Sequence, residues 1–471
     1  MSFLIYDIIL LITFAVFIFS FLYRNRKNLK KEGLLFLYKA NWGIKLIEGV
    51  GKKYNKTLKV LSYVSIILGY LLMVGAVYLV GKIVWLYVLH PSIVRAIKIP
   101  PIMPLIPYLP QIFKLNFLPP FYFTYWIIIL AIIAIAHEFA HGVFASNNQV
   151  KTKTTGFGFF PFFLPIFLAA FVELDEKIMA TKKKFSQMTI LSAGTFANVL
   201  TGILFFGIIF TFFSLTFSPA GVIFDDYSYS VIDISSIIFV NNFSVSNPSY
   251  EDISKIIQNS TFNDIRTKDR SFVGIKDVSE DFTKIALYDN SPAIHSQLVG
   301  AITKINDINI NSLDKLTEEL SKYSPGDKIL ITIKLENETQ NKEIILGENP
   351  DIKEKAWLGI RFVEPNSDSL FNKIMLKLSS FRKPNIYYES NLGEFGWFIY
   401  NLIWWTILIS FSVAFVNMLP VGIFDGGRFF YLTIWGITKK EKLAKKIFSI
   451  MTYLFLGVLV LLMVVWAKAL L

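Results

Sequence analysis

The stretch Trp126-Ile-Ile-Ile-Leu-Ala-Ile-Ile-Ala-Ile-Ala-His137-Glu-Phe-Ala-His141 is a long apolar run that ends in two histidines four residues apart. Residues four apart share one face of a helix, so His137 and His141 can hold one Zn²⁺ while Glu138 lies beside the metal as a general base. The pattern indicates metallopeptidase chemistry inside a membrane helix. The alternative is a pair of buried histidines bonded to neighbouring helices, which is costly in hydrocarbon unless the side chains have a function.

Composition also indicates a membrane protein with several spans. Hydrophobic residues make up 54% of the 471 residues, 45 of them are Phe, and the mean hydropathy is +0.50. Six apolar stretches are long enough to cross a hydrocarbon layer of about 30 Å. They cover approximately 3–23, 60–89, 121–145, 185–217, 395–419 and 447–470. We therefore expect a polytopic α-helical membrane protein with about six transmembrane helices.

The net charge of +12 argues for loops at an anionic membrane surface and against nucleic-acid binding, because most Lys and Arg residues flank the apolar stretches. The chain has no Cys, which excludes disulfides and thiolate metal ligands. Arg24 follows the first stretch without an A-x-A-like cleavage site, so we expect a retained anchor.

Loop charges predict the topology in a cell membrane. Between Arg24 and Lys59 the chain has 11 Lys or Arg and two Glu, which predicts a cytoplasmic loop. Alternating from there, the segment 90–120 is external, and the zinc-binding histidines lie in the cytoplasmic half of the third span. The segment 218–394 is then an extracytoplasmic insert.

This insert has the pattern of a small α+β domain. Residues 301–306 and 328–334 alternate like half-buried strands, and Ser312–Leu320 reads as a short amphipathic helix with a Ser cap. Together with Ser291-Pro-Ala293 and Pro325-Gly-Asp327, their order resembles a circularly permuted bacterial PDZ domain at about 270–365. That resemblance implies an extended peptide ligand added to a sheet edge. The alternative is a generic α+β module without a peptide groove.

A zinc site with two histidines needs a third protein ligand and an open position. The stretch 416–428 closes the fifth span and carries one carboxylate, Asp425, at a similar depth. From the residues alone, Asp425 is either that ligand or the cap of a short helix over 427–435. The other two histidines, His90 and His295, lie on the external side in this topology.

Three motifs together resemble the site-2 protease family of intramembrane zinc proteases, with an archaeal member as the best match. They are His137-Glu138-x-x-His141, Leu191-Ser-Ala-Gly-Thr-Phe-Ala-Asn198, and Asn417-x-x-Pro420-x-Gly422-x-x-Asp425-Gly426. The resemblance implies that Asp425 is the third zinc ligand and Glu138 the base that activates water. It also implies that Asn198 and Asn417 help to hold substrate or neighbouring loops.

The segment 165–173 resembles the family's membrane-entering hairpin, which pairs with the substrate strand; this implies substrate contacts for Ala169, Ala170 and Phe171. Here Ala169-Ala170 replaces the family's paired glycines. Thr195 stands in the second motif, and Gly422 in the third, at positions where the family usually has Pro. These departures affect loop shape and substrate grip, since no ligand or base is lost.

We thus expect an intramembrane zinc metalloprotease that cleaves transmembrane protein substrates in or near their membrane segments. Two alternatives are a metal-binding membrane transporter and a proteolytically inactive membrane scaffold. The Pro-rich segment 99–110 cannot form a regular helix, and is either an external gate or an interfacial linker. The expected regions are 1–120 (two spans), 121–217 (first half of the catalytic core), 218–394 (insert), 395–435 (second half) and 436–471 (last span).

Overall fold

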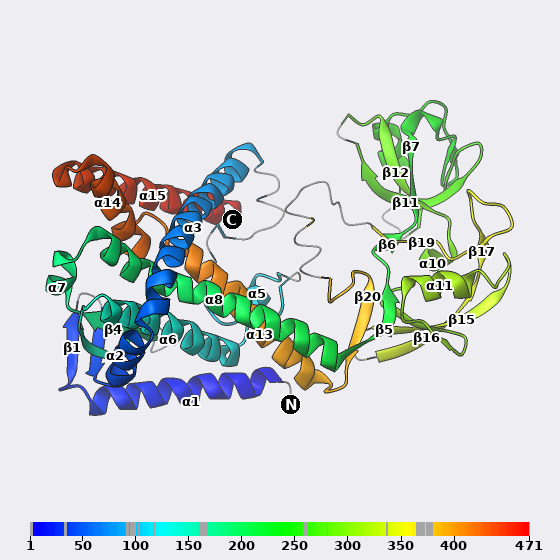
Figure 1. Cartoon of the computed structure of the whole chain (residues 1–471). Helices are drawn as coiled ribbons and strands as arrows, with labels where there is room; N and C mark the ends of the chain where they lie inside the picture. The colour runs from blue at the N-terminus through cyan, green and yellow to red at the C-terminus, as the bar shows by residue number, and fades with distance from the viewer. Residues whose placement is uncertain are drawn as a thin grey trace. The chain divides into compact units, whose positions relative to one another are not determined.

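The computed structural model describes most of the chain and divides it into two compact units. The first unit contains Met1–Phe212 and Trp397–Leu471, and the second contains Phe213–Gly396. The described residues are 3–32, 35–90, 94, 100–101, 103–115, 118–159, 168–257, 262–279, 281–335, 338–363, 373 and 380–470. Figure 1 shows the elements in chain order.

Six helices in the described part of the chain are long and apolar enough to cross a membrane, as the hydropathy pattern predicts. They are α1 (Phe3–Arg24), α3 (Asn55–Leu89), α6 (Phe123–Asn147), α8 (Lys184–Thr216), α13 (Glu394–Asn417) and α15 (Glu441–Leu470). Only 11% of the most apolar window of α1 and of α15 is buried within the protein. Apolar helices this exposed are stable in lipid, where their side chains need no protein cover.

A four-stranded antiparallel sheet accompanies these helices. Its order is β1 (Leu29–Glu32), β2 (Leu35–Ala40), β3 (Thr152–Phe159) and β4 (Leu168–Leu174), so β4 is an edge strand among the described residues. Lys39 of β2 and Thr154 of β3 both donate to the Glu173 carboxylate of β4 at 2.7 Å. These hydrogen bonds lower the pKa of Glu173 and join three strands. In the segment 165–173, residues 165–167 lie outside the described residues.

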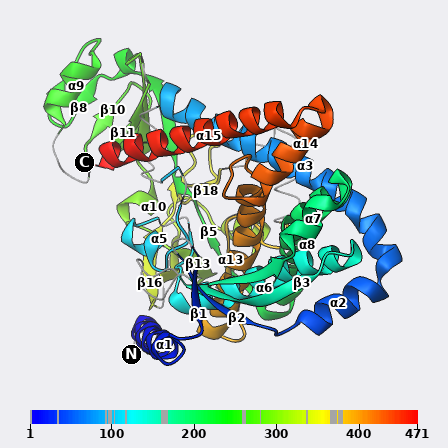
Figure 2. The same ribbon diagram turned by 90° about the vertical axis from the view of Figure 1, so that its left-hand side faces the viewer.

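Helix α2 (Ile44–Lys53) packs on α6 beside this sheet, as Figures 1 and 2 show. A Cβ at Gly142 of α6 would lie 2.8 Å from the Ile47 side chain, and one at Gly51 of α2 would lie 2.7 Å from Ser146. The two helices therefore meet through glycines that allow close approach. Helix α2 and the strands β1 and β2 were not predicted, because only the charge of the segment between Arg24 and Lys59 was interpreted.

Among its described residues the first unit also contains the short helices α5 (Leu109–Ile112), α7 (Glu176–Thr181) and α14 (Asp425–Thr438). Helix α5 lies in and just beyond the Pro-rich segment 99–110. Helix α7 begins after Asp175, whose carboxylate accepts from the backbone N–H groups of Lys177 and Ile178 at 3.1 and 3.2 Å. Helix α14 is longer than the expected 427–435.

The second unit contains two larger sheets. One has the order β7 (Tyr229–Asp233), β12 (Lys284–Asp289), β11 (Ser271–Val278), β10 (Ile265–Arg266), β8 (Phe239–Val240) and β9 (Phe243–Ser244). The other has the order β16 (Glu338–Ile345), β15 (Lys328–Leu335), β13 (Ala301–Ile305), β5 (Phe217–Ile223) and β20 (Ile386–Ser390), with β14 (Ile308–Asn309) paired to β13. Two-stranded pairs join β17 (Gly347–Glu348) to β18 (Ala356–Trp357) and β6 (Asp226–Tyr227) to β19 (Ile360–Arg361).

The predicted strands at 301–306 and 328–334 are β13 and β15, and the predicted helix is α11 (Leu313–Leu320) with Ser312 accepting from the Lys315 N–H. The helices α9 (Tyr250–Ile256) and α10 (Pro292–His295) are also present. The segment 270–365 takes β11 and β12 from the first sheet and β13 to β16 from the second, and its likeness to a PDZ domain stays a prediction.

A buried carboxylate from α1 caps the N-terminus of α6. Asp7 is 1% exposed and accepts from the backbone N–H groups of Phe123 at 2.8 Å and Thr124 at 2.9 Å. The Tyr108 hydroxyl donates to the same carboxylate at 2.6 Å. Burial and the Asp7 carboxylate raise the pKa of Tyr108, so its hydroxyl keeps the donated proton. Since Tyr122 provides no cap of its own, Asp7 satisfies N–H groups that hydrocarbon would leave unpaired.

We expect Asp7→Asn to destabilise the protein, because the carboxamide has one acceptor oxygen where the carboxylate has two and turns an NH₂ group toward other donors. The loss should be about 1–3 kcal/mol, the usual range for a buried group left without its partner. Thermal unfolding in detergent measures it. The matched control is Asp175→Asn at the exposed start of α7, which should unfold near the wild-type temperature. Equal unfolding temperatures for both variants would contradict the capping role.

Candidate metal site

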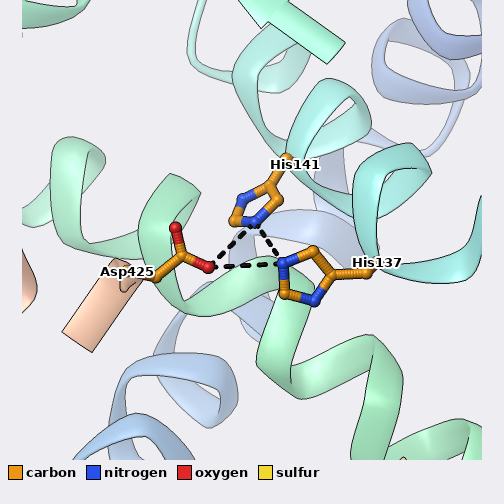
Figure 3. Close-up of side chains that lie close together, drawn as sticks. All are labelled: His137, His141 and Asp425. Carbon is orange, nitrogen blue, oxygen red and sulfur yellow. Dashed lines mark hydrogen bonds and ion pairs between the residues drawn. The ribbon is translucent and has the colours of Figure 1, made fainter. Parts of the chain in front are cut away.

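Two helices bring three metal-binding side chains together. His137 and His141, one turn apart on α6, place their Nε2 atoms 3.0 Å from each other. The Oδ2 atom of Asp425, the first residue of α14, lies 3.3 Å from the first Nε2 and 3.2 Å from the second. Figure 3 shows the three side chains pointing at one another. They form the one group of this kind among the described residues.

The spacing of these donor atoms fits zinc. A tetrahedral Zn²⁺ with bonds of about 2.0–2.2 Å holds neighbouring ligand atoms about 3.3–3.6 Å apart, and coordination can widen slightly shorter separations to that range. The three separations of 3.0, 3.3 and 3.2 Å are close to that range. Two nitrogens and one carboxylate oxygen also match the donor set of catalytic zinc sites, which leave the fourth position open.

The second ring nitrogen of each histidine also has a neighbour. His141 Nδ1 lies 2.7 Å from the backbone carbonyl oxygen of Ile190 on α8, to which it donates. His137 Nδ1 lies 3.1 Å from Nδ2 of Asn198, also on α8. Such outer contacts fix the ring orientation and the tautomer of metal-binding histidines.

The Asn198 carboxamide can accept the proton of His137. A neutral histidine that binds metal through Nε2 carries its proton on Nδ1 and needs an acceptor there. Asn198 is fully buried, and its Oδ1 atom has no hydrogen-bond partner among the described residues. Turning the amide by 180° makes Oδ1 the acceptor for His137, an orientation that heavy-atom positions alone leave open.

Gly194 allows the α8 backbone to lie directly against the two imidazoles. A Cβ at this position would lie 2.4 Å from His141 Nε2 and 2.6 Å from His137 Nε2. Gly194 belongs to the motif Leu191–Asn198, but the motif by itself gave no reason for a glycine at this point.

The tight turn between α13 and α14 places Asp425. A Cβ at Gly426 would lie 2.3 Å from the Met418 carbonyl carbon, and one at Gly427 would lie 2.2 Å from the Val421 carbonyl oxygen. The first turn of α14 therefore packs its backbone onto the preceding turn. Phe424 occupies the cap position without a side-chain bond, while the Asp425 carboxylate faces the histidines, so the alternative of a capping Asp is not what the structure has.

An ion pair fixes the other side of α14. Arg428, one turn after Asp425, donates to both carboxylate oxygens of Glu176 on α7 at 2.9 and 2.6 Å. A bidentate pair of this kind adds geometric specificity. Glu176 therefore supports the helix that carries Asp425, although its side chain is 62% exposed.

A cavity of about 370 Å³ is lined by two of the donor residues, His137 and Asp425, and by Glu138. The Glu138 Oε2 atom accepts from the Val172 N–H of β4 at 2.8 Å. The remaining wall combines apolar side chains of α6 and α13 with Asn417, Ala170 and Leu105. Leu105, in the middle of the Pro-rich segment 99–110, is thus part of the cavity wall.

The residues expected to contact substrate are placed differently from one another. Asn417 and Ala170 line the cavity, whereas Asn198 is buried against His137. Ala169 lies in β4 paired with Gly158, and its side chain lies outside the described part. Phe171 lines a second cavity, which Glu138 also lines. Of the other histidines, His90 packs on Trp85 and His295 contacts Asn290.

The model of peptidase family M50 matches residues 125–462, a range that includes all three donor residues and Glu138. The chain belongs to peptidase family M50. Members of this family are metallopeptidases, and M50 metallopeptidases use zinc. The early prediction of this family is confirmed.

An uncharacterized protein of Methanocaldococcus jannaschii is 28% identical over 200 residues. The match covers 41% of this chain and 48% of the relative, so the chain spans about half the length of the curated relative it matches.

We expect Gly194→Ala to lower zinc content and activity, because its methyl group would displace both imidazoles. A tenfold or larger loss of metal affinity is the range seen when contacts around a metal ligand are changed, roughly 10–100-fold. Metal analysis of the purified variant measures the loss. The control is Gly207→Ala on the same helix, where no atom lies within 4 Å of the added Cβ. Full zinc in both variants would refute the close-approach argument.

Proposed function

We propose that this M50 member is an intramembrane zinc endopeptidase that hydrolyses peptide bonds within or near membrane-spanning segments of other proteins. The observation that supports this most directly is the donor set of His137, His141 and Asp425 beside a cavity that also contains Glu138. A transporter or an inactive scaffold would not need an unliganded carboxylate at that place.

His137, His141 and Asp425 would hold the zinc ion, which when bound supplies a Lewis acid and lowers the pKa of water at the open position. Glu138 accepts the proton of the attacking water and can return it to the leaving amine. Asn198 and the Ile190 carbonyl oxygen hold the two imidazoles in the tautomer that leaves Nε2 free. The apolar walls formed by Ile133, Ile409 and Val413 limit the water beside these groups.

The edge strand β4 supplies hydrogen bonds for an unwound substrate. The Val172 N–H points at Glu138, away from β3. Since peptide groups alternate sides along a strand, those of Ala170 point the same way. A substrate segment in lipid must replace its helical hydrogen bonds before its peptide bond is accessible, and the Ala170 edge beside the cavity offers such partners.

We propose the sidedness from loop charge: the zinc site toward the cytoplasm, and the second unit with its PDZ-like segment outside. The substrates are then transmembrane proteins, and a peptide ligand at the second unit is a further proposal. The surrounding bilayer covers the exposed apolar faces of the six helices.

Substitutions of Glu138 and Asp425 separate proton transfer from metal binding. Glu138→Gln should keep about one zinc per chain and lose cleavage of a single-span substrate by about 10²–10⁴-fold or more, because the amide cannot take the proton. Asp425→Ala should lose zinc as well as activity, since two ligands bind the metal more weakly than three. Zinc analysis and a cleavage assay on the same preparations measure both effects.

Asp175→Ala is the matched control, because Asp175 caps α7 and has no contact with the site. Glu176 is a poorer control, since it holds Arg428 of α14. Full zinc in Asp425→Ala would move the third ligand elsewhere, and substantial cleavage by Glu138→Gln would end the assignment of the base.

The second unit is expected to restrict substrate access and to take no part in the chemistry. Its ends allow a clean excision, because Val222 of β5 pairs with Ile386 of β20 and the Ile223 N–H donates to the Asn385 carbonyl oxygen. Replacing 224–384 by an Asn-Gly turn should leave a β-hairpin that joins α8 to α13. This cut keeps both paired strands, whereas removal of about 270–365 would divide two sheets.

The shortened enzyme should keep its zinc and cleave a substrate with a short ectodomain, and should lose discrimination against substrates with bulky ectodomains. Cleavage of two substrates that share one membrane segment but differ in ectodomain size measures this. A folded, zinc-loaded variant that cleaves neither would assign the second unit to the catalytic machinery.

A further inference from the structure

A second cavity also borders Glu138, and the proposed chemistry does not use it. Its volume is about 260 Å³. Glu138 and Ala170 line this cavity as well as the one beside the metal-binding residues. We call it the aromatic pocket; its largest walls are Trp42, Ile47, Phe139, Phe157 and Phe171.

The walls of the aromatic pocket come from elements that are held firmly together. Across the sheet, Ala40 of β2 pairs with Thr155 of β3, which pairs with Val172 of β4. The chain then turns into α2 through Gly43, whose φ of 75° suits glycine. Because Ile47 of α2 packs against Gly142 of α6, the turn that carries Trp42 is fixed relative to Glu138.

The pocket is almost entirely apolar. Among the described residues that line it, Glu138 alone is charged. The Thr155 hydroxyl donates to the Trp42 carbonyl oxygen at 2.7 Å, so that polar group is already satisfied. Polar or charged occupants would lose hydration without finding partners, whereas a hydrocarbon side chain would not. The volume is several times that of one water molecule, about 30 Å³, and suits a single large side chain.

We propose that the aromatic pocket binds the side chain of a substrate residue next to the cleaved bond and selects large apolar residues such as Leu or Phe. This inference rests on the proposed peptidase function. A peptide bond in the first cavity lies beside Glu138, and a strand paired to β4 projects successive side chains to opposite faces. Glu138 and Ala170 line both cavities, so the pocket lies within reach of a side chain next to the cleaved bond of a strand paired to β4.

A panel of single-span substrates tests the proposal on the full-length, zinc-loaded enzyme. Each position within three residues of the mapped cut carries Ala, Leu, Phe or Asp in turn. At one position we expect Leu or Phe to raise kcat/KM over Ala by roughly 10- to 100-fold, the range for added methylene groups in an apolar pocket, with Asp below Ala. Other positions should show smaller effects.

Two variants change the pocket in opposite ways. Ala40→Leu fills it and Trp42→Ala removes a wall. For each variant, the kcat/KM of the Leu or Phe substrate divided by that of the Ala substrate should approach one at that position. Leu46→Phe is the matched control, because Leu46 is 61% exposed on α2 and does not line the pocket. It should leave the ratios and the zinc content as in the wild type.

The outcomes separate this inference from the proposed function. Cleavage without a position-specific preference, or a preference that both pocket variants keep, would overturn the pocket assignment and leave the peptidase intact. Equal slowing of every substrate by both variants would assign the pocket to a lipid acyl chain or to structural support, and would also overturn it. Failure of the zinc-loaded wild type to cleave any substrate would overturn the peptidase function and the pocket with it.

Discussion

The structure depends on holding the donor atoms of two imidazoles and one carboxylate 3.0 to 3.3 Å apart inside a bundle of apolar helices. Such groups are expensive in hydrocarbon unless they are paired. His137 and His141 share one helix face, but Asp425 arrives from a turn nearly 300 residues later in the chain. The glycines at 194, 426 and 427 matter because they let backbone segments approach closely enough for the three atoms to meet.

The contacts that position the metal-binding residues come from several segments, none of which has a distinctive sequence pattern. The Ile190 carbonyl oxygen and Asn198 orient the histidines from α8, and the Glu176–Arg428 pair holds α14. The strand β4 contributes the Val172 N–H to Glu138. The histidines, Asp425 and Glu138 are thus each positioned by a different element: α8, α7 and β4.

The features that depend on short-range sequence patterns were predicted from the sequence. Six apolar runs became six long helices, and the spacing of His137 and His141 put them on one face. The third ligand needed a family resemblance, because one Asp near a span end also suits a helix cap. The strands β1 and β2, the packing of α2 on α6 and the role of Asp7 were missed. The pairing of β2 with β3, the packing of α2 on α6 and the Asp7 contact join segments about 90 to 120 residues apart, which leave no periodic signal, and β1 is the hairpin partner of β2.

The contact between Asp7 and the start of α6 has a consequence for biogenesis. The two partners are 116 residues apart, so α1 is synthesised and enters the bilayer well before the helix it caps. During that interval the carboxylate lacks its backbone partners from α6, and burial of a charged group without partners is costly. Arrival of Phe123 and Thr124 lets it enter the bundle as a hydrogen-bonded group. The order of translation thus makes completion of the first span a condition for seating the helix that carries the histidines.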